Sequence, residues 1–170
     1  MFSLVVDDFC VQCEGIQHSK HLKESLEIHY EVALDREGRL FCGITLDWNY
    51  NMKHVDMSVP GYVQRNRTKS QHPNPLNPQQ SPYQATPIRY GTKVQHPVQL
   101  DTTALPPPEK IKRVQEIVGS FIWYGRACGP TLTAYLSTIA SRQTKGTEYV
   151  LAARHQILDY LATHPDADIC

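Results

Sequence analysis

The amino-acid sequence predicts an α+β fold in which two β-hairpins and a helix come first and a helical region comes last. Short β-rich runs alternate with turn residues up to residue 59, and apolar residues recur at helical spacing after residue 109. Between them, nine prolines lie in residues 73–108. Proline fixes φ and lacks the N–H donor, so this stretch is expected to be an extended connector.

The first hairpin is expected at the N-terminus. Two β-rich runs, Phe2–Val6 and Phe9–Gln12, flank the dipeptide Asp7-Asp8. This pattern predicts two strands with both carboxylates at the turn between them. Apolar residues at four-residue spacing then predict a helix over residues 18–30.

A second hairpin is expected over residues 40–59. Its strands would be residues 40–46 and 52–59, on either side of turn residues 49–51. Gly43 would then lie inside a strand. A glycine there marks either a close approach of another backbone or a simple bulge.

Three helices are expected after residue 109. The first covers about residues 111–127, the second starts with Pro130 in its first turn, and the third covers about residues 147–162. The sequence then ends where a further element would be expected.

Charge is distributed unevenly along the chain. The 17 basic and 17 acidic residues cancel, but residues 1–50 carry a net −5, residues 51–113 a net +6 and residues 114–170 a net −1. This segregation suits an acidic metal site beside a phosphate-binding stretch. No apolar run approaches the ~18 residues of a membrane span, and the five cysteines suggest free thiols. We therefore expect an intracellular chain with no membrane partner.

The carboxylates of Asp7 and Asp8 are the most specific chemical groups. Such oxygens bind Mg²⁺, the metal that clamps phosphates during in-line phosphoryl transfer. An isolated Asp-Asp turn is more often a solvated loop. The surrounding order of elements distinguishes the two interpretations.

That order is an apolar strand, Asp7-Asp8, a second strand, a helix and then Phe41-Cys42-Gly43-Ile44-Thr45-Leu46. It resembles the palm of reverse transcriptases from retroviruses and LTR retrotransposons, and the stretch from Val118 to Leu161 resembles the copia type of the latter. The resemblance implies that Asp7 and Asp8 are catalytic and hold Mg²⁺ or Mn²⁺. It also implies that Phe41, Cys42, Gly43, Ile44, Thr45 and Leu46 form the primer grip. Val5 departs from the pattern, because the family usually has an aromatic residue there.

The helix expected after residue 109 resembles the thumb helix of the same family. At about 100° per residue its apolar residues gather on one arc, and Gln115, Gly119 and Trp123 share the opposite arc with Lys112 and Arg126. A mid-helix glycine costs ~1 kcal/mol relative to alanine and needs a reason. That reason is either contact with nucleic acid or packing against a neighbouring helix.

A short basic cluster follows Pro60-Gly61. Arg65, Arg67 and Lys69 are the kind of side chains that bind backbone phosphate without reading sequence. A solvated helix face is the alternative for three such charges.

The resemblance implies a fragment of an RNA-directed DNA polymerase that uses two-metal phosphoryl transfer. Expected partners are an RNA or RNA–DNA template-primer and the rest of a pol polyprotein, with dNTP bound only by the complete enzyme. The alternative is a decayed retroelement product that is at most a non-catalytic, sequence-independent nucleic-acid binder. The expected segments are a partial palm (1–59), a basic and proline-rich linker (60–108), a thumb/connection-like region (109–163) and a lead into a missing RNase H domain (164–170).

Overall fold

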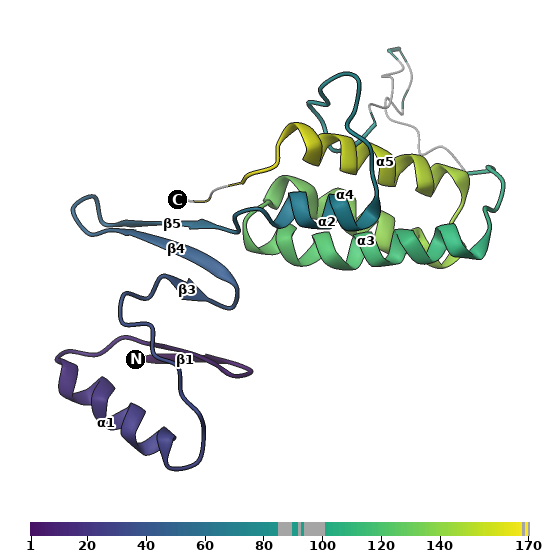
Figure 1. Ribbon diagram of the computed structural model, residues 1–170. Helices are drawn as coiled ribbons and strands as arrows, with labels where there is room; N and C mark the ends of the chain where they lie inside the picture. Colours follow the sequence, from purple (N-terminus) through teal and green to yellow (C-terminus); the bar gives the residue numbers. More distant parts are fainter. Residues whose placement is uncertain (85–89, 92, 94–100, 168, 170) are drawn as a thin grey trace. The chain divides into compact units, whose positions relative to one another are not determined.

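A computed structural model describes residues 1–84, 90, 91, 93, 101–167 and 169, and it confirms the α+β fold class. The described chain forms two compact units (Figure 1). The N-terminal unit comprises Met1–Ser58 together with Ile169, and the helical unit begins at Val59. The chain therefore divides ahead of residue 60, and the described start of the proline-rich segment belongs to the helical unit.

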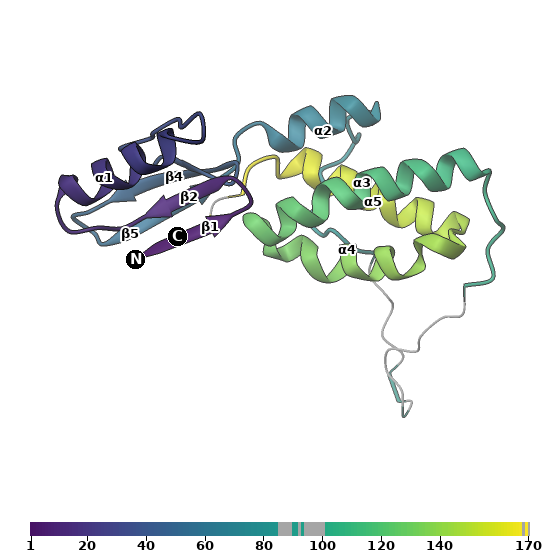
Figure 2. The same ribbon diagram turned by 90° about the horizontal axis from the view of Figure 1, so that it is seen from below.

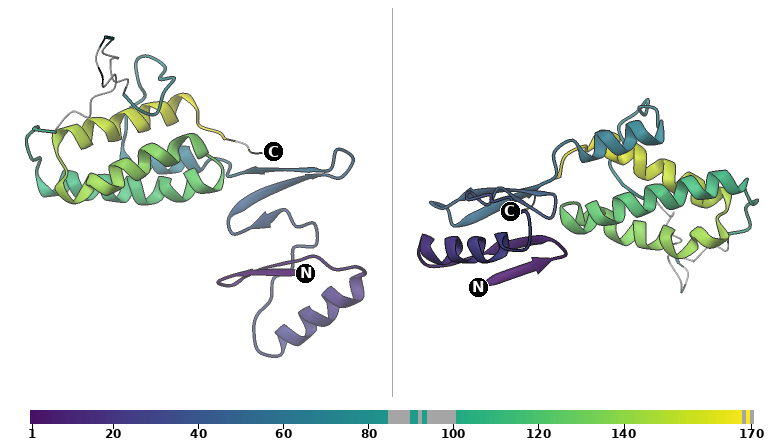
Figure 3. Two further views of the ribbon diagram at one scale, coloured as in Figure 1. Left: turned by 180° about the vertical axis from the view of Figure 1, so that it is seen from behind. Right: turned by 60° about the horizontal axis from the view of Figure 1, so that its bottom comes forward.

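The N-terminal unit begins with the predicted hairpin. Strand β1 (Phe2–Val5) pairs antiparallel with β2 (Asp8–Val11), and Val5 lies opposite Asp8. Val6 and Asp7 form the turn, so the prediction that both carboxylates lie in the turn holds for Asp7, whereas Asp8 is the first residue of β2. Helix α1 (Ile16–Glu27) follows and lies beside this hairpin (Figures 1 and 3). It begins and ends somewhat earlier than predicted.

The second sheet of this unit has three antiparallel strands, not two. They are β3 (Leu40–Phe41), β4 (Ile44–Asn49) and β5 (His54–Ser58), in the order β3-β4-β5. The prediction of one strand over residues 40–46 is wrong, because Cys42 and Gly43 form a turn with φ of 51° and 79°. Positive φ at both central residues is typical of tight two-residue hairpin turns. Gly43 is therefore a turn residue and not a strand residue.

The described part of the helical unit contains the three helices predicted after residue 109, together with one α-helix and one short 3₁₀ helix that were not predicted. The predicted helices are α3 (Pro108–Ala127), α4 (Pro130–Arg142) and α5 (Glu148–Thr163), with a short 3₁₀ helix, η1 (Gln143–Lys145), between the last two. Proline stands in the first turn of α3 and α4, where its missing N–H costs nothing. The additional α-helix is α2 (Tyr62–Ser70).

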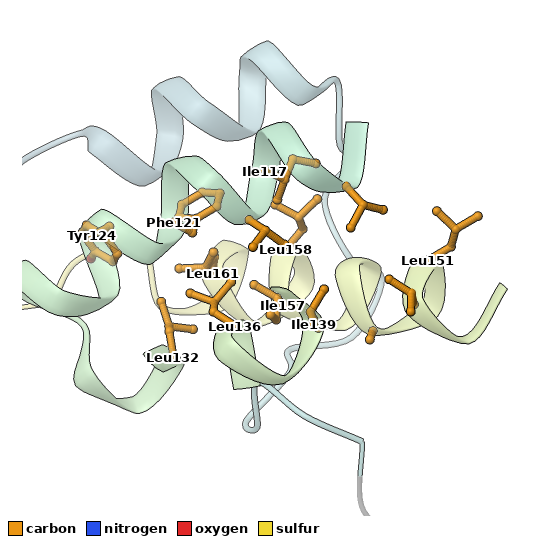
Figure 4. Packing of buried hydrophobic residues seen from close by; sticks show 14 of the residues in the cluster. Ile117, Phe121, Tyr124, Leu132, Leu136, Ile139, Leu151, Ile157, Leu158 and Leu161 are labelled. Atoms are coloured by element: carbon orange, nitrogen blue, oxygen red, sulfur yellow. The ribbon is translucent and has the colours of Figure 1, made fainter. Parts of the chain in front are cut away.

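The four longer helices enclose one apolar core. Helices α3 and α5 contact each other and both contact α2 and α4, which lie on opposite sides of the pair (Figure 2). Figure 4 shows the buried side chains, among them Phe121, Leu136 and Leu158. The apolar arc predicted for α3 is confirmed, since Val114, Ile117, Val118, Phe121 and Tyr124 are all buried.

The described start of the proline-rich segment is held against α5 and α4. The Gln79 N–H donates to Thr163 Oγ1 at 2.9 Å, and Gln156 Nε2 donates to the Ser81 carbonyl at 2.8 Å. The Tyr83 ring packs edge-on against Tyr135. Residues 71–84 and 101–107 contain neither helix nor strand, as predicted for a connector, and residues 85–89, 92 and 94–100 lie outside the described part.

Within the described residues, no helix combines the length and apolar character needed to cross a membrane.

Candidate functional site

The Asp-Asp turn and the Cys42-Gly43 turn lie next to each other in the N-terminal unit. Asp8 Oδ2 accepts a hydrogen bond of 3.1 Å from the backbone N–H of Cys42. Asp7 and Asp8 are both exposed at the end of their hairpin. The structure thus brings together two motifs that the sequence separates by the whole of α1.

The Cys42 thiol is a poor candidate for a nucleophile or a metal ligand at this turn. Partial burial raises the pKa of the Cys42 thiol, and the negative charges of Asp8 and Asp7 raise it further. A thiol with a raised pKa is protonated at neutral pH and is a poor nucleophile and metal ligand. Asp7 and Asp8 therefore remain the candidate metal-binding groups at this turn.

Two carboxylates offer the oxygen ligands that Mg²⁺ prefers. Asp8 shares one oxygen with the Cys42 N–H, and no hydrogen bond of the Asp7 carboxylate is seen among the described residues. Across the described ranges, no group of three or more His, Cys, Asp or Glu side chains converges. The donor set is of the right chemical kind for Mg²⁺ but supplies part of a coordination shell.

The segment matched to the primer grip is a hairpin of its own. Phe41 lies opposite Ile44 across the turn, and Gly43 is exposed at the tip. Phe41, Cys42, Ile44, Thr45 and Leu46 are each partly buried. The exposed backbone at Gly43 is the part of this segment that is free to meet a ligand.

The polar face of α3 is exposed along its length. Lys112, Gln115, Gly119, Trp123 and Arg126 are all exposed. A Cβ added at Gly119 would meet nothing within 4 Å, so packing within the helical unit does not require a glycine there. Packing against a neighbouring helix of the described unit therefore does not explain Gly119.

Trp123 fits both explanations, because it is exposed to a partner and also packs against a neighbouring helix. Its side chain is 38% exposed, and one part of its ring packs on Tyr62 of α2 with 5.1 Å between ring centroids. Tyr62 also stacks on Tyr124 and donates to the Ser120 carbonyl at 2.9 Å. Tyr62 was not singled out from the sequence. The signal for it was an aromatic residue directly after Pro60-Gly61, where a helix starts.

The basic cluster on α2 is smaller than the sequence suggests. Arg65 and Lys69 are exposed, but Arg67 is only 6% exposed and its Nη2 donates to Asn74 Oδ1 at 2.7 Å. Val63 and Arg67 are four residues apart, so both lie on the buried face of α2. Arg65 and Lys69 are therefore the exposed cations of this cluster, whereas Arg67 fixes the loop that follows the helix.

No protein-family model, curated protein or solved structure matches this chain.

Proposed function

We propose that this chain is part of a retrotransposon-type reverse transcriptase, an RNA-directed DNA polymerase that acts on a template-primer duplex. The observation that carries the proposal is the hydrogen bond from the Cys42 N–H to Asp8 Oδ2. It joins the carboxylate turn to the turn of the segment that resembles the primer grip. The sequence resemblance had named both segments without reference to their distance in space.

In this proposal Asp7 and Asp8 hold Mg²⁺ or Mn²⁺ at the exposed end of their hairpin. The metal would supply charge neutralisation at the reacting phosphates. The residues of this chain would hold the metal-binding carboxylate and the primer end in place. The Cys42 N–H fixes the Asp8 carboxylate, and the exposed backbone of Gly43 would receive the primer end beside it.

The α3 face supports the nucleic-acid part of the proposal. Lys112 and Arg126 can meet phosphates, Gln115 can donate to minor-groove acceptors, and Gly119 leaves room for a duplex to approach. Trp123 presents a flat surface whose position is fixed by Tyr62. This face is ready for contact without any change in the core beneath it.

Polymerase activity is proposed for the complete enzyme and not for this chain alone. Two carboxylates leave the metals under-coordinated, and the family uses a third carboxylate and a nucleotide pocket from other parts of the polyprotein. The purified chain with Mg²⁺, dNTP and a primed template should therefore give no extension. Template-dependent incorporation that Asp7→Asn abolishes would overturn this expectation.

Metal binding provides the direct test of the carboxylate turn. Mn²⁺ added to the labelled full chain should broaden the NMR signals of residues 6–9 and of Cys42 and Gly43. The broadening should disappear in Asp7→Asn and persist in Asp47→Asn, which removes an exposed carboxylate from β4. Equal broadening in both variants would contradict the proposal.

The second candidate is a non-catalytic, sequence-independent nucleic-acid binder. The exposed α3 face favours it, because that face needs no carboxylate to bind a duplex. Salt-dependent binding of an RNA–DNA hybrid together with no Mn²⁺ response at Asp7 would select this candidate. Mn²⁺ binding at Asp7 and Asp8 together with hybrid binding would select the polymerase fragment.

A further inference from the structure

Two adjoining pockets in the helical unit share a pair of arginines. One pocket, of about 230 Å³, lies between α2, α3 and α5, and the other, of about 370 Å³, lies between α3 and α5. Arg113 of α3 and Arg154 of α5 line both. The smaller pocket is also lined by Lys69, Glu116 and Ser120.

Positive charge exceeds negative charge around these arginines. Lys69, Arg113 and Arg154 face the smaller pocket against the single carboxylate of Glu116. The larger pocket adds the cation of Lys110 against the carboxylate of Glu148, and the imidazole of His155 also lines it. The ion pairs of the described residues involve other side chains, so neither arginine has a carboxylate partner within 4.0 Å in that part of the chain.

Arg154 is held in an unfavourable environment. Its Nε is buried and has no hydrogen-bond partner among the residues that the structure describes, and its Nη2 lies 2.5 Å from His155 Nε2. Burial lowers the pKa of the Arg154 guanidinium, and the charge of Arg113 lowers it further. A partly dehydrated cation beside a second cation is costly unless an anion pairs with it.

The neighbouring His155 does not neutralise the positive charge of Arg154. Burial lowers the pKa of its imidazole, and the nearby Arg154 lowers it further. The lowered pKa favours the neutral form of His155, which can accept a hydrogen bond from the Arg154 guanidinium. The pocket keeps a net positive charge.

We propose that Arg113 and Arg154 form a binding site for a phosphate-type oxyanion, with Lys69 at its rim. Guanidinium groups present planar sets of donors that match phosphate oxygens. The smaller pocket is below the roughly 300–1,000 Å³ of sites for drug-sized ligands, which suits one phosphate group better than a whole nucleotide. This proposal does not rest on the polymerase assignment.

The site is distinct from the polar face of α3. At about 100° per residue, Arg113 and Ser120 lie roughly a third of a turn around α3 from Gly119. A duplex on the Gly119 face and an anion in the pocket would therefore contact different sides of the helix. Substitutions in the arginine pocket can therefore be compared with substitutions on the Gly119 face.

Titration of the full chain with inorganic phosphate at constant ionic strength tests the site. Amide NMR shifts should saturate and should map to residues near Arg113 and Arg154. Arg113→Gln should weaken the affinity about tenfold or more, the loss expected for one charge-assisted hydrogen bond. Arg36→Gln removes the same charge from an exposed position of the N-terminal unit, whose residues line neither pocket, and should leave phosphate affinity unchanged. Absence of saturable binding, or equal weakening in both variants, would overturn the proposal.

A second variant protects the test against loss of folding. Arg154→Lys keeps the charge but removes the planar donor set, so phosphate affinity should fall while thermal unfolding stays cooperative. Unchanged affinity in Arg154→Lys would contradict the role given to the guanidinium.

The source of the phosphate can be distinguished with an RNA–DNA hybrid. If the pocket takes a backbone phosphate, inorganic phosphate should compete with the hybrid, and Arg113→Gln should reduce the salt slope of hybrid binding by about 1. If the pocket takes a free phosphorylated molecule, hybrid affinity should be the same in Arg113→Gln and wild type while phosphate affinity falls. Either pattern supports an oxyanion site.

Discussion

The two units differ in how much they bury. Among the described residues of the N-terminal unit, none is fully buried, and Phe2 remains 69% exposed. In the helical unit, Phe121 and Leu136 are 0% exposed. Secondary structure forms in both units, but an apolar core forms in only one of them. The comparison shows that well-paired strands and a helix do not by themselves enclose apolar side chains.

Hydrogen bonds hold the N-terminal unit in place of a core. The Asp35 carboxylate accepts the backbone N–H groups of residues 37–40, and Trp48 Nε1 donates to the Gly38 carbonyl at 2.7 Å. Met57 and Ile169 exchange backbone hydrogen bonds of 2.8 and 3.1 Å. Small sheets without a packed face are marginally stable in water. We therefore expect this unit to open at a lower free energy than the helical unit.

The largest expected effect tests this difference directly. Phe121→Ala removes a fully buried ring and should lower the free energy of unfolding of the helical unit by about 3–5 kcal/mol. Phe2→Ala removes an exposed ring and should change the stability of the chain much less. Denaturant unfolding followed by helical circular dichroism measures the first effect, and hydrogen exchange of β1 and β2 measures the second. Similar losses from both variants would refute the comparison.

A smaller loss of stability is expected for a substitution on α2, where a buried cation, Arg67, can be compared with an exposed one, Lys69. Arg67→Ala removes the donor to Asn74 and leaves space beneath the helix, so it should cost about 1–3 kcal/mol of stability. Lys69→Ala is the control, because Lys69 is exposed and should leave the unfolding midpoint almost unchanged. The reverse order of effects would show that α2 does not pack as described.

Trp123 lies between the two extremes of burial. Trp123→Ala should weaken RNA–DNA hybrid binding by roughly 1–3 kcal/mol. Loss of the ring contact with Tyr62 should lower stability by only about 0.5–1.5 kcal/mol. Filter binding and thermal melting of the same variant separate the two effects. A sharp fall in melting temperature with unchanged hybrid binding would make Trp123 a packing residue alone.

The smallest expected effect is a pH dependence of the helical unit. The pKa of His155 is lowered from 6.5, chiefly by burial and by Arg154, so the folded state prefers the neutral ring. The neutral ring therefore contributes its full stability above pH 6.5. This contribution is lost as the pH falls from 6.5 toward the lower pKa that His155 has in the folded chain. As the pH is lowered by ~2 units from about 7.5, the melting temperature should therefore fall more steeply for the wild type than for His155→Gln. Parallel curves would show that His155 does not contribute.

Periodicity and turn chemistry predicted much of this structure. The first hairpin follows from two β-rich runs, although Asp8 proved to be the first residue of β2, and the buried and exposed arcs of α3 follow from helical spacing alone. Both signals are local, since each depends on residues within one element. Elements of this kind can be recognised before their tertiary contacts are known.

The features missed by the sequence depend on tertiary contacts or on very short elements. Strand β3 has two residues, so Cys42 and Gly43 look like part of a longer run until the φ angles are known. Arg113 and Arg154 are far apart in sequence, and only the packing of α3 on α5 places them in one pocket. Buried Arg67 looks like any surface cation until its partner Asn74 is located.

The Cys42-Gly43 turn also determines where the N-terminal unit can accept insertions and deletions. β4 is paired with β3 on one side and with β5 on the other, and side chains alternate between its two faces. Deleting Gly43 would force β4 to shift by one position, which exchanges its two faces and removes the Cys42 N–H from Asp8. The turn between β4 and β5 is exposed over residues 50–53, and added residues there would leave both strands in register. Length variation in this unit should therefore be tolerated at residues 50–53 and excluded at residues 42 and 43.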